Sequence, residues 1–581
     1  METERKCKVE EAESRERSSC KFYVTLPRRI FERKDLVLLA AGSLSCVRGI
    51  YMTAAANNAL DRYRYTVVSQ SEYATGEAAA KIKALIEKTM ETLKPSGIIL
   101  YVSCMEVITD LDFERIKAEI DNPEGIIIEI LRRGPLVKRH TDPEETLNEI
   151  FSKLPEQKED IKTIGIMVPP PMPDFEAIFS MLQGHDNYNF LLTAGGCDGC
   201  FSEKKQAINI RKSRLNDVDV SLGCEELYVN GIAEDMERNV PEKEAVILGS
   251  AVPNVTGTDY DRIRSDLEEK NKRVTLIKTD GFQSGEEGIS RGYRMLMKAK
   301  TERESDNRIK NAVGILGAHP LATASAEKIA HGMEHLDQDN YEAHLFENEA
   351  LENLGVFRNM NMNWVVSLGG ISAADYLKQE YGIPYLLGIP VGKRAMMAWR
   401  KAVNRLMGQT DDLSVPERKT GRKSDLKVLL AGDPVLTKGI AQYLYDMQGI
   451  ENTKRTVFAR IPSQEKWYET AFKMAENSEA IFADETVSLS EVDCFRNRSE
   501  WAKLVESADI ILCDGLLKEI YESMPYVKKD NSKKWILMPE PLLSSGIKTE
   551  SNKNDEDYII FGKKGAAYIS EKMGLPAPSN M

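Results

Sequence analysis

One pattern recurs along the chain: a short run of apolar, mostly β-branched residues, then a loop, then a segment with helical spacing of its apolar residues. Examples start at "GIILYVSC" (97–104), "AVGILGAHP" (312–320) and "KVLLAGDPV" (427–435). Strands that are apolar throughout are typical of parallel sheets covered by helices on both faces. The pattern predicts an α/β fold with several Rossmann-like domains, whose ligands lie at the carboxyl ends of the strands.

The chain has 581 residues, several times the length of one domain, and charged polar stretches indicate where its domains meet. The expected units are a charged N-terminal arm (1–36), a first cysteine-containing α/β domain (37–160), a second α/β domain (161–308), a Rossmann-like domain (309–410), a linker (411–425) and a C-terminal Rossmann-like domain with a tail (426–581).

Charge and hydropathy exclude several classes of partner. The formal net charge is −13, which argues against nucleic acid or an anionic membrane surface. No apolar run reaches the roughly 18 residues of a membrane span, and the polar start "METERKCKVEEAESRERSS" lacks the apolar core of a secretory signal. We therefore expect a cytoplasmic protein whose nine cysteines are thiols or metal ligands.

An internal repeat relates the first two α/β domains. "YVSCMEVITDLDFERI" (101–116) and "LGSAVPNVTGTDYDRI" (248–263) match at an offset of 147 residues, which pairs Asp112 with Asp259. The same offset pairs Gly134 with Gly281 in the next strand and loop. Blocks that match in the same order predict a duplicated α/β unit.

The repeat also relates two glycine-rich turns upstream. "AGSLSC" (41–46) pairs with "GGCDGC" (195–200), so that Cys46 corresponds to Cys200 and Ser43 to Cys197. If the units are duplicated, we expect these two turns to occupy equivalent places and to face each other.

Three cysteines in a fixed order carry a resemblance to a known family. Cys20 comes first, Cys46 ends the glycine-rich turn, and Cys104 follows an apolar strand and precedes "MEVITDLDFERI". Together with later blocks such as "NWVVSLGGISAADYLKQEYGIPYLLGIPVG" (363–392), this order resembles component 1 of nitrogenase and the nitrogenase-like reductases. The resemblance runs from about Cys20 to about residue 543 and implies a nitrogenase component 1-like fold.

The same resemblance implies a cofactor. In the family the three cysteines bind an iron–sulfur cluster, so Cys20, Cys46 and Cys104 are the expected ligands of a 4Fe–4S cluster or a larger one. Their thiolates suit iron, and the exposed N–H groups of a glycine-rich turn stabilise an anionic cluster. The alternative is that each cysteine is a small buried hydrophobe.

The second unit departs from the family pattern. It has Ala251 where the first has Cys104, and no cysteine in "IMVPPPMPDFEAIF" (166–179), but it adds Cys197 and Cys224. In the family two such domains from two subunits share a cluster, so we expect this chain to supply both halves of the site. For Cys197, Cys200 and Cys224 three interpretations stay open: cluster or metal ligands, redox thiols of a C-x-x-C pair, or structural cysteines.

Two absences bear on the activity. The sequence contains no Gly-x-x-x-x-Gly-Lys-Ser/Thr, so ATP would be bound by a separate P-loop iron–sulfur ATPase, as in the family. No cysteine lies in 312–394, where nitrogenase would hold its molybdenum–iron cofactor, so nitrogen fixation is not expected. The later cysteines are Cys494, expected in a helix-like loop, and Cys513, expected at the end of a strand.

Some histidines and arginines are also candidates for a site. His319, at the carboxyl end of a strand, is either a site residue or a loop residue that caps the next helix. His331 and His335 have the i, i+4 spacing of a metal pair, but a solvated helix face explains them as well. Arg394 and Arg400 would either bind a carboxylated substrate or form a basic surface helix.

These features predict a nitrogenase-like component 1 protein, an iron–sulfur oxidoreductase subunit. It would accept electrons from the P-loop iron–sulfur ATPase and reduce a substrate that the sequence does not name. We expect a homodimer, or a hetero-oligomer with a related component 1 subunit. The alternatives are a scaffold for metallocluster assembly, which binds a cluster without turnover, and a structural or regulatory relative without a cluster.

Overall fold

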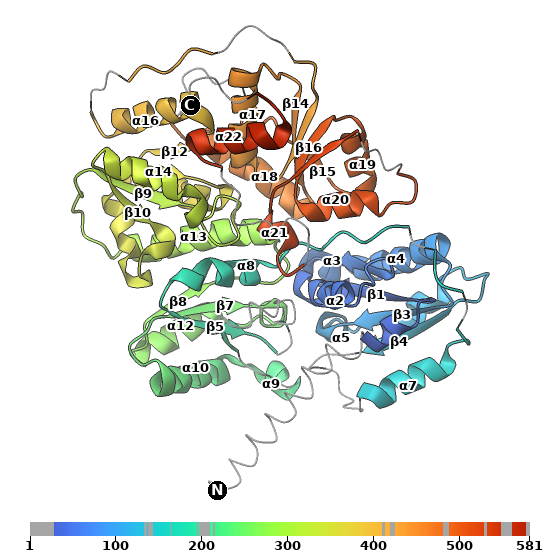
Figure 1. Ribbon diagram of the computed structural model, residues 1–581. Helices are drawn as coiled ribbons and strands as arrows, with labels where there is room; N and C mark the ends of the chain where they lie inside the picture. Colours follow the sequence, from blue (N-terminus) through green and yellow to red (C-terminus); the bar gives the residue numbers. More distant parts are fainter. Residues whose placement is uncertain are drawn as a thin grey trace.

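The computed structural model describes most of the chain and arranges it as parallel sheets with helices around them (Figure 1). The described residues are 28–132, 136, 143–157, 159–162, 164–194, 197, 210–212, 215, 217–409, 413–418, 424–479, 487–527, 532–547 and 560–576. Cys20, Cys200 and Gly134, on which several predictions rest, lie outside these residues.

The first sheet has the strand order β2-β1-β3-β4, and all of its pairs are parallel. Its strands are β1 (Leu36–Gly42), β2 (Tyr63–Val67), β3 (Gly97–Val102) and β4 (Ile127–Arg132). The helices around it are α2 (Leu44–Ala56), α3 (Gln70–Thr75), α4 (Glu77–Leu93), α5 (Cys104–Ile108), α6 (Phe113–Ala118) and α7 (Pro143–Lys153).

The second sheet has the order β6-β5-β7-β8 and is also parallel. Its strands are β5 (Tyr188–Leu192), β6 (Ile210–Lys212), β7 (Ala245–Gly249) and β8 (Val274–Ile277). The helical segments of this part are α8 (Asp174–Met181), η1 (Leu182–Gly184), α9 (Asp217–Leu222), α10 (Glu225–Asn239), α11 (Ala251–Val255), α12 (Tyr260–Glu269) and α13 (Gly285–Thr301).

The third sheet, with the order β10-β9-β11-β12, lies beside α13 (Figure 1). Its strands are β9 (Ala312–Leu316), β10 (Glu342–Leu345), β11 (Met362–Val365) and β12 (Tyr385–Leu387). Its helical segments are α14 (Ala326–Gln338), η4 (Phe346–Asn348), η5 (Leu351–Asn359), η6 (Leu368–Gly370), α15 (Ile371–Tyr381) and α16 (Gly392–Leu406).

The fourth sheet has the order β15-β14-β13-β16-β17. Its strands are β13 (Val428–Ala431), β14 (Thr453–Phe458), β15 (Asp493–Phe495), β16 (Ile510–Cys513) and β17 (Lys534–Leu537). Its helices are α17 (Pro434–Gln448), α18 (Pro462–Ala475), α19 (Arg498–Glu506), α20 (Gly515–Glu522) and α21 (Pro541–Ser544), and the chain then continues to α22 (Gly562–Met573).

The α/β fold class predicted from the sequence is confirmed. Strands β1, β3, β5 and β7 are buried along their whole length, as expected for parallel sheets covered on both faces. Two local predictions were wrong. Cys46 lies in the first turn of α2 rather than in the preceding loop, and Cys494 lies in β15, because an edge strand pairs there with β14. None of the helices in the described part of the chain is long and apolar enough to cross a membrane.

The first two units share local detail at the predicted offset. Asp112 and Asp259 are the N-caps of α6 and α12, both with φ −81° and ψ 91°, and each accepts a bond from the N–H three residues later. The strand orders also correspond, but the third sheet has that order too, so the order alone does not distinguish a duplication from a common Rossmann-like topology. The duplication therefore stays a prediction.

Buried charges join the first unit to the others. The Arg48 guanidinium, fully buried on α2, donates to the Pro170 carbonyl at 2.9 Å and to the Ser545 carbonyl at 3.0 Å. Its Nε lies 3.5 Å from Glu176 Oε2 on α8. These contacts fix α2 against the segment that precedes α8 and against the residue that follows α21.

The last helix returns to the third sheet. α22 packs against α16, and the Gly562 N–H donates to the Pro390 carbonyl at 2.8 Å. Phe561, just before α22, contacts the rings of Trp364 and Trp399, and all three side chains are buried. The core of the third unit therefore includes residues from the C-terminal end of the described chain.

Replacing Trp364 by alanine should lower the free energy of unfolding by about 3–5 kcal/mol. The substitution leaves a cavity between β11, α16 and α22 and removes the bond from Nε1 to the Gly388 carbonyl. Urea unfolding followed by tryptophan fluorescence and circular dichroism measures the change. Leu222→Ala, at a side chain that is 82% exposed, is the matched control and should stay within about 0.5 kcal/mol of the wild type. Equal effects of the two substitutions would contradict this assignment of the core.

Candidate functional site

The loop between β1 and α2 brings the first unit against the second. The Leu44 N–H donates to the Gly281 carbonyl at 3.1 Å, across the two units. Gly42, with φ +139°, allows a close approach, because a Cβ there would lie 3.2 Å from Ser103 Oγ and 3.6 Å from the Cys46 Cβ. The Ser43 hydroxyl donates to Cys46 Sγ at 3.5 Å. The Cys46 thiol therefore lies at the junction of the two units.

Cys104 lies on the neighbouring strand-to-helix connection. It is the first residue of α5, just after β3, and β3 pairs directly with β1. Ser103 is the N-cap of α5 and forms a capping box with Glu106. Because the carboxyl ends of β1 and β3 share one edge of the sheet, Cys46 and Cys104 lie on the same side, as the sequence predicted.

Cys197, from the segment after β5, joins these two cysteines. It interacts electrostatically with both Cys46 and Cys104, and Cys104 also interacts with Cys46. The second unit thus contributes a sulfur to the cysteine site, which we define as Cys46, Cys104 and Cys197. Cys20 and Cys200, the other expected ligands near this site, lie outside the described residues.

The thiols of the cysteine site are neutral at physiological pH. Burial, then the nearby Cys197 and the Glu106 carboxyl, raise the pKa of Cys46 to about 12, whereas hydrogen bonds from Ser43 and Ser103 oppose the rise. Burial and Cys197 likewise raise the pKa of Cys104 well above its usual range. Iron would displace these protons, since thiolates are the ligands of iron–sulfur clusters.

The cysteine site is not arranged for a single ion. In the described part of the chain, no group of three or more His, Cys, Asp or Glu side chains could hold one metal ion. Three soft sulfur donors from two units suit a cluster of several metals better than one tetrahedral ion. The residues present therefore fit an iron–sulfur cluster better than a single metal ion.

A buried carboxyl lies under the cysteine site. Glu106 Oε2 accepts bonds from the Ser103 N–H at 2.8 Å and the Ser103 hydroxyl at 2.5 Å, and Oε1 accepts one from the Tyr73 hydroxyl. Burial is the largest influence on Glu106 and raises its pKa, although these bonds oppose the rise. Glu106 thus ties α3, β3 and α5 into one support for the cysteines.

The remaining described cysteines lie elsewhere. Cys224 is the N-cap of α10, and its Sγ lies 3.5 Å from Thr258 Oγ1 inside the core of the first two units. Cys513 is buried at the end of β16, and Cys494 is on β15. Cys224, one of the candidate ligands, therefore has the contacts of a structural cysteine.

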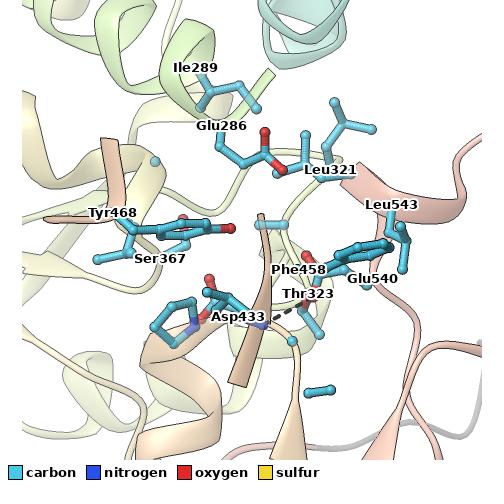
Figure 2. Close-up of a pocket in the computed structure, with 18 of the residues that line it drawn as sticks. Glu286, Ile289, Leu321, Thr323, Ser367, Asp433, Phe458, Tyr468, Glu540 and Leu543 are labelled. Atoms are coloured by element: carbon cyan, nitrogen blue, oxygen red, sulfur yellow. Dashed lines mark hydrogen bonds between the residues drawn. The ribbon is translucent and has the colours of Figure 1, made fainter. Parts of the chain in front are cut away.

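A cavity of about 60 Å³ opens between the third and fourth sheets (Figure 2). Its walls come from the start of α13, the connection after β9, the loop between β13 and α17, the end of β14, α18 and the segment before α21. The polar lining residues are Glu286, His319, Thr323, Ser367, Asp433, Arg460, Tyr468 and Glu540. It is large enough for a few water molecules or a small ligand.

Two carboxyl groups meet at one side of this cavity. Glu540 Oε2 accepts bonds from the Thr323 hydroxyl at 3.2 Å and the Asp433 N–H at 3.1 Å. Burial, then the charges of Asp433 and Asp514, raise the pKa of Glu540 to about 8. Burial raises the pKa of Asp433 to about 6, against the bonds from the N–H groups of α17. At neutral pH the pair therefore holds a proton on Glu540.

The opposite side of the cavity carries an ion pair and a neutral imidazole. Arg460 Nη2 lies 3.3 Å from Glu286 Oε1, whereas Arg460 Nε and Glu286 Oε2 are buried without a hydrogen-bond partner. His319 Nδ1 is buried and unpartnered too, and burial lowers the pKa of His319 to about 3. Unpartnered buried polar atoms around a cavity are places where a ligand or water would bond.

The cysteine site and the cavity are structurally connected. Arg48, two residues after Cys46, donates to the Pro170 carbonyl, and Arg460 at the cavity reaches the same carbonyl at 3.5 Å. Gly281, which bonds to the loop before Cys46, is followed by α13 and its cavity residue Glu286.

Comparison with known proteins agrees with the resemblance seen in the sequence. Residues 197–447 match the family model described as nitrogenase component 1 type oxidoreductase. The matched residues make up less than half of the chain, and this part is similar to the nitrogenase component 1 family. No curated protein sequence matches the chain.

Two solved structures are similar to parts of this chain. The structure titled "Nitrogenase Cp1 at pH 6.5" has a TM-score of 0.47 and 12% identity, and the match covers 72% of this chain and 94% of that one. The structure titled "Nitrogenase Cp1 at pH 5" has a TM-score of 0.42 and 13% identity, and the match covers 62% and 83%.

The other candidate residues within 197–447 form hydrogen bonds or ion pairs with neighbouring side chains. His331 bonds to Glu334 at 2.8 Å, and its ring centre lies 4.9 Å from that of His335. Arg394 pairs with Asp446 and Arg400 with Asp339, so the predicted basic surface helix is instead tied to neighbouring segments.

Sequence reasoning missed most of the cavity. It singled out His319 but not Asp433, Arg460, Tyr468 or Glu540. A signal was present, because Asp433 follows the apolar strand "VLLA" and Glu540 follows "WILMP", both at carboxyl ends of strands.

Tyr73→Phe should lower the free energy of unfolding by about 1–3 kcal/mol, because it removes the donor to the buried Glu106 carboxyl. Chemical denaturation of the metal-free protein measures this effect apart from any cofactor. Tyr526→Phe, at a ring that is 62% exposed, is the control and should change stability by less than about 0.5 kcal/mol. A Tyr73→Phe protein as stable as the control would show that Glu106 does not depend on this bond.

Proposed function

We propose that this chain is a nitrogenase-like component 1 subunit that holds electrons on an iron–sulfur cluster at the cysteine site and reduces a small substrate in the cavity. The observation that carries the proposal is that Cys46, Cys104 and Cys197, from two separate α/β units, lie near enough to interact electrostatically. A cluster there draws ligands from both units of one chain, with Cys20 and Cys200 as further candidate ligands.

The electron source is a separate iron–sulfur ATPase with a P-loop. The chain has no Gly-x-x-x-x-Gly-Lys-Ser/Thr of its own, so ATP hydrolysis takes place on the partner. Hydrolysis coupled to each transfer makes delivery of single electrons irreversible. The working assembly is a homodimer or a hetero-oligomer with a related component 1 subunit.

The cavity supports a reductive role rather than a purely structural one. It is connected to the cysteine site by the Pro170 carbonyl, to which both Arg48 and Arg460 donate. Its lining combines an acidic pair, a buried ion pair and a neutral imidazole. A relative without a cofactor would have no need to keep thiols and unpartnered polar groups buried in two connected places.

Cys46→Ser and Cys104→Ser should each lower bound iron and acid-labile sulfide by about half or more, because a hydroxyl is a harder and weaker ligand for iron than a thiolate. Cys513→Ser is the control, since Cys513 is a buried thiol that lies away from the cysteine site, on β16. Iron and sulfide are measured after anaerobic purification. Cys197→Ser should behave as the two ligand variants do.

The wild-type protein is then mixed with the P-loop iron–sulfur ATPase and ATP, and cluster reduction is followed by electron paramagnetic resonance. Reduction that needs ATP supports the oxidoreductase proposal. A cluster that binds but is never reduced would point to the assembly scaffold. An iron content that is equal in all variants would indicate a structural or regulatory relative without a cluster.

A further inference from the structure

We propose that Glu540 is the proton donor of the cavity and that Asp433 is the positioning residue that keeps it protonated. The inference rests on the proposed function, because a reduction in the cavity needs a proton for each electron that is added. It goes further by assigning that proton to one carboxyl oxygen and by naming the class of substrate.

The backbone fixes the Glu540 carboxyl toward the cavity. Its N–H donates to Asp514 Oδ2 at 2.8 Å, which holds the residue at the start of α21. Gly432, with φ +151°, leaves room for the carboxyl, since a Cβ there would lie 3.1 Å from Glu540 Oε2. The Asp433 N–H can therefore reach Oε2 directly.

The hydrogen-bond pattern leaves one oxygen for the acidic hydrogen. Both bonds that Glu540 accepts, from Thr323 and from the Asp433 N–H, end on Oε2. An oxygen that accepts two hydrogen bonds is the carbonyl-like one, so the hydrogen belongs on Oε1. Figure 2 shows the Glu540 carboxyl beside Thr323 at the edge of the cavity.

The other groups that face the cavity are poorer proton donors near neutral pH. His319 has already lost its proton, because burial lowers its pKa to about 3. Burial and the nearby Glu286 and Glu540 raise the pKa of Tyr468 well above its usual range. Arg460 stays paired with Glu286. Glu540, with a pKa of about 8, is the best match to a general acid at neutral pH.

Asp433 and Asp514 supply the charge that keeps the proton in place. Asp433 lies at the start of α17 and Asp514 at the start of α20, and both raise the pKa of Glu540. Asp514 is bonded to the Glu540 N–H and the Ser544 hydroxyl, which ties it into the fold. Asp433 is thus the more suitable residue to change.

The substrate is a small unsaturated or nitrogen–oxygen compound with a hydrogen-bond-accepting atom, of a size that fits the cavity. A cluster held by the cysteine site would supply the electron, after reduction by the iron–sulfur ATPase. The O–H bond of Glu540 Oε1 breaks, a bond forms between that hydrogen and the substrate atom, and Glu540 becomes a carboxylate. The adjacent Asp433 charge makes this carboxylate basic, so it takes a proton back from water.

The first test needs neither cluster nor turnover. Infrared difference spectra recorded against pH should show a protonated carboxyl band that disappears with a midpoint near the Glu540 pKa of about 8. Glu540→Gln should remove that band, and Asp433→Asn should lower its midpoint by roughly one unit, because a negative neighbour is lost. Glu347→Gln is the control. Glu347 is buried outside the cavity lining and has a pKa of about 7, so its replacement should leave the carboxyl band with the midpoint near 8 intact.

The second test uses hydroxylamine as the probe, which takes up two electrons and two protons to give ammonia and water. With the cluster-loaded protein, the P-loop iron–sulfur ATPase and ATP, Glu540→Gln should form ammonia about 100-fold or more slowly than the wild type. Its cluster should be reduced to the same extent, as measured by electron paramagnetic resonance. Glu347→Gln should keep the wild-type rate.

The outcomes separate this inference from the proposed function. A wild-type cluster that the ATPase cannot reduce refutes the proposed function, while the infrared titration still decides where the proton lies. A band that survives in Glu540→Gln overturns the inference. So does a Glu540→Gln protein that forms ammonia at the wild-type rate, or a wild-type protein with a reduced cluster that forms none.

Discussion

The buried guanidinium of Arg48 is the contact on which the arrangement of the units depends. Removing a charge from water costs several kcal/mol, so the structure must compensate it with bonds that hold their geometry. Arg48 finds two such bonds, to the Pro170 and Ser545 carbonyls, and its Nε also lies 3.5 Å from the Glu176 carboxylate. Moving either segment away would remove a bond from the buried charge, so the segments are held together.

This constraint places two chemically different sites at a set separation. Cys46 is one half-turn from Arg48 on α2, and Arg460 reaches the same Pro170 carbonyl from the cavity side. The cysteine site is lined by sulfur and a buried acid, whereas the cavity holds fixed charges and unpartnered polar atoms. The first environment suits storing electrons on a metal cluster, and the second suits binding a molecule that receives them.

The sequence predicted the α/β class and the placement of Cys46 and Cys104 at one edge of a sheet. Continuous apolar strands indicate a parallel sheet, and residues just after such strands lie at its carboxyl edge. It paired Cys200 with Cys46 and Cys197 with Ser43, and so gave no reason to single out Cys197 as the cysteine of the second unit that lies near Cys46 and Cys104. The Glu540 and Asp433 pair was beyond reach for a related reason. These residues are 107 positions apart, and their encounter depends on how β13 and β17 sit in one sheet.

The return of α22 to the third sheet has a consequence for how the protein is made. A ribosome releases the chain from its N-terminus, and domains fold as they emerge. Trp364 must wait until Phe561 has been synthesised before its packing is complete. For nearly two hundred residues of translation the third unit would expose part of its core, which makes it the stage at which the nascent chain most needs a chaperone.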